Sequence, residues 1–200
     1  YTSFTSNAPR ITDLGLLTEE ARTNVVTYSR DLTNAAWVKS NTTAAKDQTG
    51  VDGVTNSASS LTASAGNGTA LLTTSIASSV RFQSAFVKRL VGTGTVEMTM
   101  DNGSTWTAVT VTAAWTRVTI PSQTLANPIV GFRIGTNADS IAVDFVQNEN
   151  GAFVTSPIEC TGSATARSAD LITLTTVPVS GGTWTAFIDA TSATTARHRR

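Results

Sequence analysis

The feature that most constrains the fold of this chain is an alternation of apolar and polar side chains that begins at Val80 and continues to Val146. A two-residue period is typical of a β-strand with one buried face. The segment VRFQSAFVKRL (80–90) is therefore predicted to be a central strand. Its expected faces are Val80, Phe82 and Phe86 toward the core, and Arg81, Gln83 and Arg89 on the opposite side.

A hairpin is predicted to follow this strand. In TVEMTM (95–100) the alternation places Val96, Met98 and Met100 inward, and Thr95, Glu97 and Thr99 outward. After Asp101, Asn102, Gly103 and Ser104 the pattern resumes with Val109 and Val111. Tight hairpin turns need positive backbone φ, which Asn and Gly tolerate, so Asn-Gly between two alternating segments indicates a hairpin.

Three more alternating segments continue the series, namely WTRVTI (115–120), IVGFRIG (129–135) and SIAVDFV (140–146). Regularly spaced short strands are typical of a sandwich. The predicted fold is all-β, with eight to ten strands in two antiparallel sheets that form a jelly-roll-like β-sandwich.

Little helix is expected. Thr18–Thr23 is the best candidate for one or two turns, because Thr18 could cap a turn that carries Glu19 and Glu20. The turn residues between Lys46 and Gly68 predict a long loop or short edge strands.

The two ends differ from the middle, which predicts three parts: an extended N-terminal arm over 1–14, the sandwich over 15–160, and a linker with extra C-terminal strands over 161–200. The strand-like pieces LITLTTVPV and GGTWTAFIDA are too few for a core of their own. They must pair with the sandwich, with another subunit, or with residues outside this sequence. A chain that starts with Tyr1 is expected to be processed or to be one segment of a longer polypeptide.

Composition excludes several functions. Charged residues make up 14% of the chain and the net charge is zero, so no basic patch is available for nucleic acid. The short basic tail 197–200 is expected to be a solvated or interface-bound end. No apolar stretch reaches the length of a membrane span. The single Cys160 cannot form an internal disulfide.

We do not expect an enzyme. The single histidine, His198, lies near the C-terminus, so no rigid element can place it in a catalytic triad or a metal site. A glycosidase with two carboxylates would have to draw on Glu97, Asp101, Asp139, Asp144 or Glu149, and none of these lies in a recognisable motif. No cofactor is expected, although Asp and Asn side chains in loops leave a structural calcium ion open.

Two segments carry a family resemblance. They are GLLTEEARTNVVTYSRDLTNAAWVKS (Gly15–Ser40) and ENGAFVTSPIECTGSATARSAD (Glu149–Asp170). Both resemble segments of structural proteins of tailed bacteriophages and phage-like particles, in which they bracket a jelly-roll domain similar to carbohydrate-binding modules. The resemblance implies a head fibre, spike, decoration or tail-associated subunit at the particle surface. It also implies that other virion proteins are the partners. The chain itself is expected to form a homo-oligomer, such as the trimer found in fibres and spikes.

Within GLLTEEARTN we expect a structural clasp where the arm meets the sandwich, made by Glu19, Glu20, Arg22 and Asn24. One of the glutamates would pair with Arg22 or with Arg30, while Arg22 and Asn24 would bind backbone groups. Direct contact with a neighbouring virion protein is the alternative. The resemblance also implies that Trp37 closes one end of the sandwich and that Trp115 is a packing residue.

Exposed aromatic residues are the candidates for sugar binding, because Trp and Tyr rings stack on sugars and anchor interfaces. If Val109 and Val111 face the core, then Trp106 lies on the outer surface beside the hairpin. Trp106 is therefore the first candidate, followed by Tyr28 and Trp184. Two functions remain: a virion structural component, and an adhesin module that binds a polysaccharide of the host surface. An enzyme such as a depolymerase ranks third.

Overall fold

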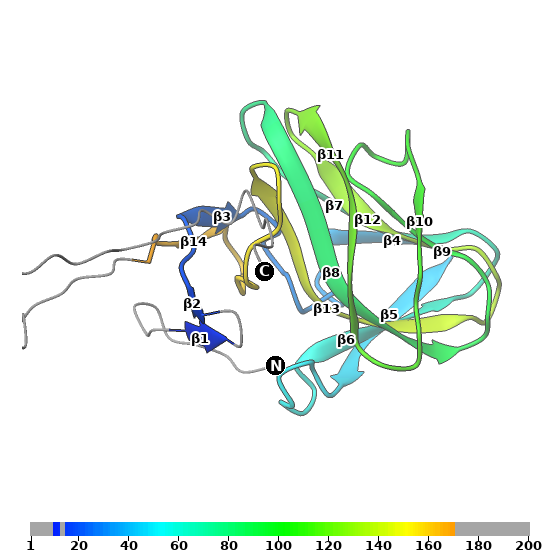
Figure 1. The fold of residues 1–200 in the computed structure, drawn as a ribbon. Coiled ribbons are helices and arrows are strands. Elements are labelled where there is room, and N and C mark those ends of the chain that lie inside the picture. Colours follow the sequence, from blue (N-terminus) through cyan, green and yellow to red (C-terminus); the bar gives the residue numbers. More distant parts are fainter. Residues whose placement is uncertain (1–9, 13–14, 171–200) are drawn as a thin grey trace, which may run out of the picture.

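The computed structural model describes residues 10–12 and 15–170, and Figure 1 shows that this part of the chain consists of strands and loops. The first of two five-stranded sheets has the order β10 (Thr107–Val109), β9 (Val96–Thr99), β12 (Ile129–Ile134), β7 (Gly68–Thr73) and β4 (Trp37–Ser40). The second has the order β11 (Thr116–Leu125), β8 (Ser79–Val91), β13 (Ser140–Asn150), β6 (Ala58–Ala63) and β5 (Thr42–Gln48).

Neighbouring strands in both sheets are antiparallel, and the chain crosses repeatedly from one sheet to the other, for example from β4 to β5 and from β7 to β8. This arrangement is an antiparallel jelly-roll-like β-sandwich, as the sequence predicts. Two further pairs lie outside the sandwich: β1 (Arg10–Thr12) with β2 (Gly15–Leu17), and β3 (Arg22–Asn24) with β14 (Thr165–Arg167). The part of the chain described contains no helix, and so none that could cross a membrane.

The hydrophobic core lies between the two five-stranded sheets. Trp37 is 1% exposed, its indole Nε1 donates to the carbonyl of Tyr28 at 3.0 Å, and its ring lies 6.4 Å from that of Phe132. Burial of such large side chains supplies most of the driving force for folding. Trp37 is thus a core residue at the β4 end of the sandwich.

The predicted hairpin is present. Thr107, Ala108 and Val109 pair with Met98, Glu97 and Val96 in β9. The turn residues Asn102 and Gly103 have φ of 61° and 77°, the left-handed values that this turn requires. Val96, Met98 and Met100 are buried as predicted. Thr99, expected outward, is also buried, because its hydroxyl accepts a hydrogen bond from the Gly103 amide at 2.9 Å and donates one to Asp101.

The prediction for the two faces of β8 was wrong. Arg81 and Gln83 are buried at 2% and 0% exposure, on the same inward face as Ala85 and Val87. The expected core residues, Val80, Phe82 and Phe86, lie on the outward face, where Val80 is 45% exposed. The physical reason is that the smaller apolar side chains Ala85 and Val87 pack into the core cluster, while the outward Phe86 ring is covered by the Arg117 guanidinium.

The predicted helix at Thr18–Thr23 is absent. The backbone of this segment bonds to the C-terminal part of the domain instead, and Arg22–Asn24 forms strand β3. The Lys46–Gly68 segment also differs from the expectation, because β6 lies inside the second sheet between β13 and β5. β5 lies at an edge of that sheet, and residues 49–57 form the loop between β5 and β6, as the turn residues predict.

Arg30 closes the sandwich at this loop. It is 6% exposed, and its Nε donates to Asp144 at 2.7 Å while its Nη2 donates to Ser57 at 2.6 Å. Asp52 lies 2.9 Å from Nη1, and the Phe145 ring centroid lies 4.1 Å from the guanidinium carbon. Burial by itself would raise the pKa of the Asp52 carboxyl. Its hydrogen bonds, first that with Arg30, lower the pKa by more than burial raises it, so the pKa of Asp52 lies below its ordinary value. Asp52 therefore contributes stability at neutral pH that is lost as the pH falls below about 4.

We expect Arg30→Met to destabilise the domain by about 3–5 kcal/mol, because the carboxylate of Asp144, which is fully buried, would lose its partner. Urea denaturation followed by tryptophan fluorescence measures the loss. Lys46→Met is the matched control, since Lys46 forms an exposed ion pair with Asp31 at 3.9 Å and its removal should cost under about 1 kcal/mol. Equal effects of the two substitutions would contradict the role given to Arg30.

Candidate functional site

The incoming and outgoing parts of the chain meet at Asn24. Its carboxamide nitrogen donates to the carbonyls of Val146 at 3.0 Å and Ile158 at 2.9 Å. Its carboxamide oxygen accepts from the amides of Val26 and Asn148, both at 3.1 Å. Asn24 is fully buried, so all four bonds form out of contact with water. One side chain therefore joins β3, β13 and the segment that follows β13.

Glu19 makes a second set of contacts between the same parts of the chain. Its carboxylate accepts from the Ser156 amide at 2.6 Å and from Arg167 at 3.0 Å. Its backbone amide donates to the Asp170 carboxylate at 2.9 Å, and the Asp170 amide donates back to its carbonyl at 2.8 Å. Residues 19 and 170 are thus directly bonded, and the chain enters and leaves the domain at one place.

The remaining contacts of this group involve one arginine and two acids, of which one is buried. Arg22 pairs with Glu20 at 2.8 Å, one of the pairings expected from the sequence, and lies 3.7 Å from Glu149. Glu149 is fully buried and accepts from the Thr155 amide at 2.8 Å and the Thr155 hydroxyl at 2.7 Å. Arg30, the alternative partner considered for these glutamates, pairs with Asp52, Asp144 and Glu159. We call Glu19, Glu20, Arg22, Asn24 and their partners in 146–170 the clasp.

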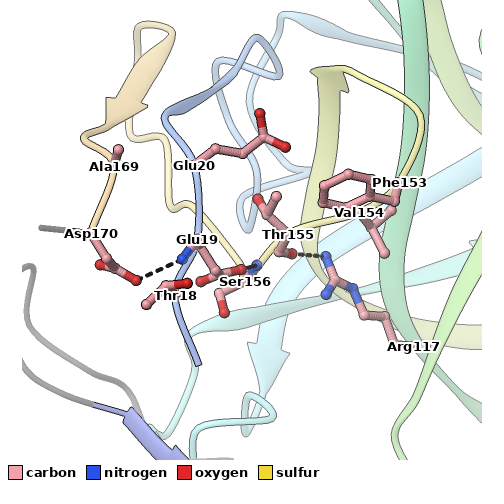
Figure 2. A pocket seen from close by; sticks show the side chains of 10 residues that line it. All are labelled: Thr18, Glu19, Glu20, Arg117, Phe153, Val154, Thr155, Ser156, Ala169 and Asp170. Carbon is pink, nitrogen blue, oxygen red and sulfur yellow. Dashed lines mark hydrogen bonds between the residues drawn. The ribbon is translucent and has the colours of Figure 1, made fainter. Parts of the chain in front are cut away.

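A cavity of about 760 Å³ lies between the clasp and the second sheet. Figure 2 shows its walls: Thr18, Glu19, Glu20, Arg117, Phe153, Val154, Thr155, Ser156, Ala169 and Asp170. Arg117 donates to the Thr155 carbonyl at 2.6 Å and lies over the Phe86 ring at 5.7 Å. The cavity therefore takes its walls from both ends of the domain, and its shape depends on the clasp.

Trp106 lies on the outer face of the first sheet. Its neighbour Thr107 pairs with the inward Met98, which directs Trp106 outward as predicted. The guanidinium carbon of Arg133 lies 4.6 Å from the ring centroid, and Arg133 pairs with Glu97 at 2.5 Å. The indole also contacts Gly103, where a Cβ would come within 2.9 Å of Nε1.

The result is a half-exposed aromatic ring with a cation, a carboxylate and turn backbone around it, which we call the Trp106 face. Figure 1 shows β9 and β10 on the side of the molecule opposite β3 and β14, so this face and the clasp are far apart. Arg133 was missed by the sequence reasoning. Its cross-strand position opposite Glu97 could have been found only from the register of β12 and β9.

The other two aromatic candidates do not join this face. Tyr28 is half-buried, packs against the core, and pairs through its backbone with Thr161 on the clasp side. Trp184 lies outside the described residues. Trp115 is half-buried on the second sheet, with the Lys88 ammonium 5.0 Å from its ring centroid. The structure therefore leaves Trp106 as the candidate on an outer face far from the clasp.

The described residues can be compared with the requirements of a metal site and of a reactive thiol. They contain no group of three or more His, Cys, Asp or Glu side chains that could hold a metal ion. Cys160 is 2% exposed, and burial raises the pKa of its thiol. The thiol lies 3.4 Å from the Asn24 carbonyl, so it packs within the clasp region.

No protein-family model and no curated protein matches the chain. Among solved structures, it is similar to the enzymatically active domain of tailspike protein 4 of bacteriophage CBA120, with 15% identity and a TM-score of 0.45 over 62% of this chain and 21% of that chain. It is also similar to the CBM22-1 xylan-binding domain of Paenibacillus barcinonensis Xyn10C, with 13% identity and a TM-score of 0.43 over 65% and 94%.

A third similar structure is the C-terminal CBM6 of LamC from Zobellia galactanivorans, with 8% identity and a TM-score of 0.41 over 66% of this chain and all of that one. The neighbours are thus carbohydrate-binding modules and a phage tailspike domain. The chain spans about a fifth of the tailspike chain. At these identities the likeness concerns the fold, which the strand order already assigns to antiparallel β-sandwiches.

We expect Asn24→Ala to cost about 3–4 kcal/mol, because the substitution leaves the buried amides of Val26 and Asn148 without acceptors. Hydrogen exchange should show the largest loss of protection in β3 and in residues 157–162. Thr23→Ala, in the same strand, is the control and should stay within about 0.5 kcal/mol. A uniform loss of protection across both five-stranded sheets would contradict a local role for the clasp.

Proposed function

We propose that this chain is a displayed jelly-roll module of a phage or phage-like virion structural protein, such as a head fibre, spike, decoration or tail-associated subunit. The observation that supports this most is the clasp. The two segments that resemble virion proteins, Gly15–Ser40 and Glu149–Asp170, are far apart in sequence and are bonded to each other through Asn24, Glu19 and Asp170.

A domain that the chain enters and leaves at one place can project from a larger body without interrupting the fold of that body. The sandwich extends away from that joint toward β9 and β10 (Figure 1). Such a module suits the surface of a particle, where other virion proteins hold the joint. For a fibre or spike we further propose a symmetric homo-oligomer, a trimer in the first instance.

The oligomer is tested on the chain of residues 1–200 by analytical ultracentrifugation across a range of concentrations. We expect a trimer, because the strand-like segments beyond residue 170 are too short to fold alone and would be shared between copies. Removing residues 171–200 should then give a monomer that retains the melting temperature of the sandwich. A stable monomer of the whole chain at high concentration would count against the fibre or spike assignment.

Glycan binding is the second candidate function, and the Trp106 face favours it. A half-exposed indole beside Arg133 and Glu97 offers a stacking surface with hydrogen-bond donors and acceptors around it. The location opposite the clasp would leave this face accessible on a particle. We propose a polysaccharide of the host surface as the ligand class, with Trp106 as its anchor.

We further propose that the module has no catalytic activity. The five carboxylates considered as glycosidase candidates are spread over both sheets and each accepts a hydrogen bond within the chain. These bonds join Glu97 to Arg133, Asp101 to Thr105, Asp139 to Gly94, Asp144 to Arg30 and Glu149 to Thr155. Asp144 and Glu149 are fully buried, which favours a structural role for both.

Replacing Trp106 by Ala should weaken binding to a purified host polysaccharide by about 30-fold or more, as expected of an aromatic anchor. The melting temperature should fall by no more than a few degrees. The control is Trp115→Ala, which removes another half-buried indole that is stacked by a cation, in this case Lys88, from the other sheet. Isothermal titration calorimetry measures both variants, and equal loss in both would contradict a site at Trp106.

A further inference from the structure

The interior of the sandwich contains a positive charge that no carboxylate of the described residues balances. Arg81 is 2% exposed, and the hydrogen bond of its guanidinium is a long one, from Nη1 to the neutral Oδ1 of Asn148 at 3.3 Å. Its Nε has no hydrogen-bond partner in the described chain. Burial lowers the pKa of Arg81, and no neighbouring acid offsets this change.

The next inward position on the same strand adds a second unpartnered group. Gln83 is fully buried, and neither its Nε2 nor its Oε1 has a partner among the described residues. Two residues before Arg81, the hydroxyl of Ser79 is also buried without a hydrogen-bond partner among the described residues. These three residues follow one another at a spacing of two along β8. The start of β8 thus directs three polar side chains to one side, and each has at least one buried polar atom without a hydrogen-bond partner among the described residues.

What distinguishes Arg81 from Arg89 on the same strand is that it has no carboxylate partner among the described residues. Arg89 lies on β8 at the same parity and has a carboxylate partner, Asp139 at 3.5 Å, and a carbonyl partner, Gly94 at 2.7 Å. The carboxylate of Glu149 on the adjacent strand is not available to Arg81. Glu149 pairs in register with the outward Phe82 and accepts from Thr155 on the opposite face of the sheet.

An isolated buried cation is costly, and an arginine cannot lose its proton to avoid that cost. Water could accept hydrogen bonds from Arg81 but would not balance its charge. An anion does both. The donors available to it are the Nε–H of Arg81 and the Nε2–H groups of Gln83, which come from neighbouring inward positions. The Oε1 of Gln83 needs a donor, which a water molecule bound beside the anion would supply.

We propose that Arg81 and Gln83 hold a small monovalent anion, of the size of chloride, between the two sheets at the start of β8. A small ion is the appropriate class because this region is closed: Arg81 and Gln83 are together almost inaccessible to solvent. The site is separate from the Trp106 face and from the clasp cavity. The proposal of an anion therefore does not rest on the proposed functions. Its effect is to stabilise the folded sandwich in proportion to the anion concentration.

The first test measures the melting temperature while chloride replaces gluconate at constant ionic strength. Raising chloride from about 1 mM to about 300 mM should raise it by about 4–8 °C in the unsubstituted chain, for a dissociation constant near 10 mM. Arg81→Met should abolish this dependence and be at least as stable as the unsubstituted chain when chloride is low. Arg89→Met is the matched control; it should be less stable at every chloride concentration but retain the dependence.

The second test does not depend on any variant folding. Crystals of the unsubstituted chain grown in bromide should show an anomalous peak beside Arg81 Nε and Gln83 Nε2. A water molecule alone at that position, or a melting temperature that is independent of chloride, would overturn the proposal. So would a chloride dependence that persists undiminished in Arg81→Met, because the stabilising anion would then bind elsewhere.

Discussion

The four hydrogen bonds of the Asn24 carboxamide are the interaction on which the closure of the domain at its two ends depends. They join strand β3, which is part of the clasp, to the last strand of the sandwich and to the segment that leaves it. Backbone groups can pair with one another at such a junction only if the segments form a regular sheet. One amide side chain can instead hydrogen-bond to the backbone of three segments that do not share a sheet. The domain can therefore close at its ends without adding a strand to either sheet.

Several charged residues of the described chain form ion pairs inside the domain. Arg30 with Asp144, Arg22 with Glu149, and Arg89 with Asp139 are all mostly buried. The remaining surface is rich in Thr and Ser, which hydrogen-bond without carrying charge. Buried ion pairs contribute little net stability compared with apolar side chains, but breaking one is costly. They thus fix how the loops and ends dock on the sheets more than they add to the stability of the fold.

The sequence was sufficient to predict the fold class but not each strand. Val96, Met98 and Met100 alternate with polar residues against a turn that needs Asn and Gly, so their direction follows from local chemistry. On β8 the larger apolar residues point outward, and hydrophobicity alone selects the wrong face. The clasp contacts that join the two ends of the domain connect residues more than 120 positions apart, as between Asn24 and Val146. The GLLTEEARTN motif indicated where they would form, but their partners depend on the tertiary fold.

The departure of β8 from the expected pattern is also the strongest sign that it does more than fill space. A strand that was selected only for packing would place Phe82 and Phe86 inward and Arg81 and Gln83 outward. The observed strand leaves polar groups unpartnered in the core, which is a cost that persists only if something else offsets it. The outward aromatic side chains then have cations beside them, as Phe86 has Arg117. Both faces of β8 thus depend on charge, the outer one through neighbouring side chains and the inner one through a bound ion.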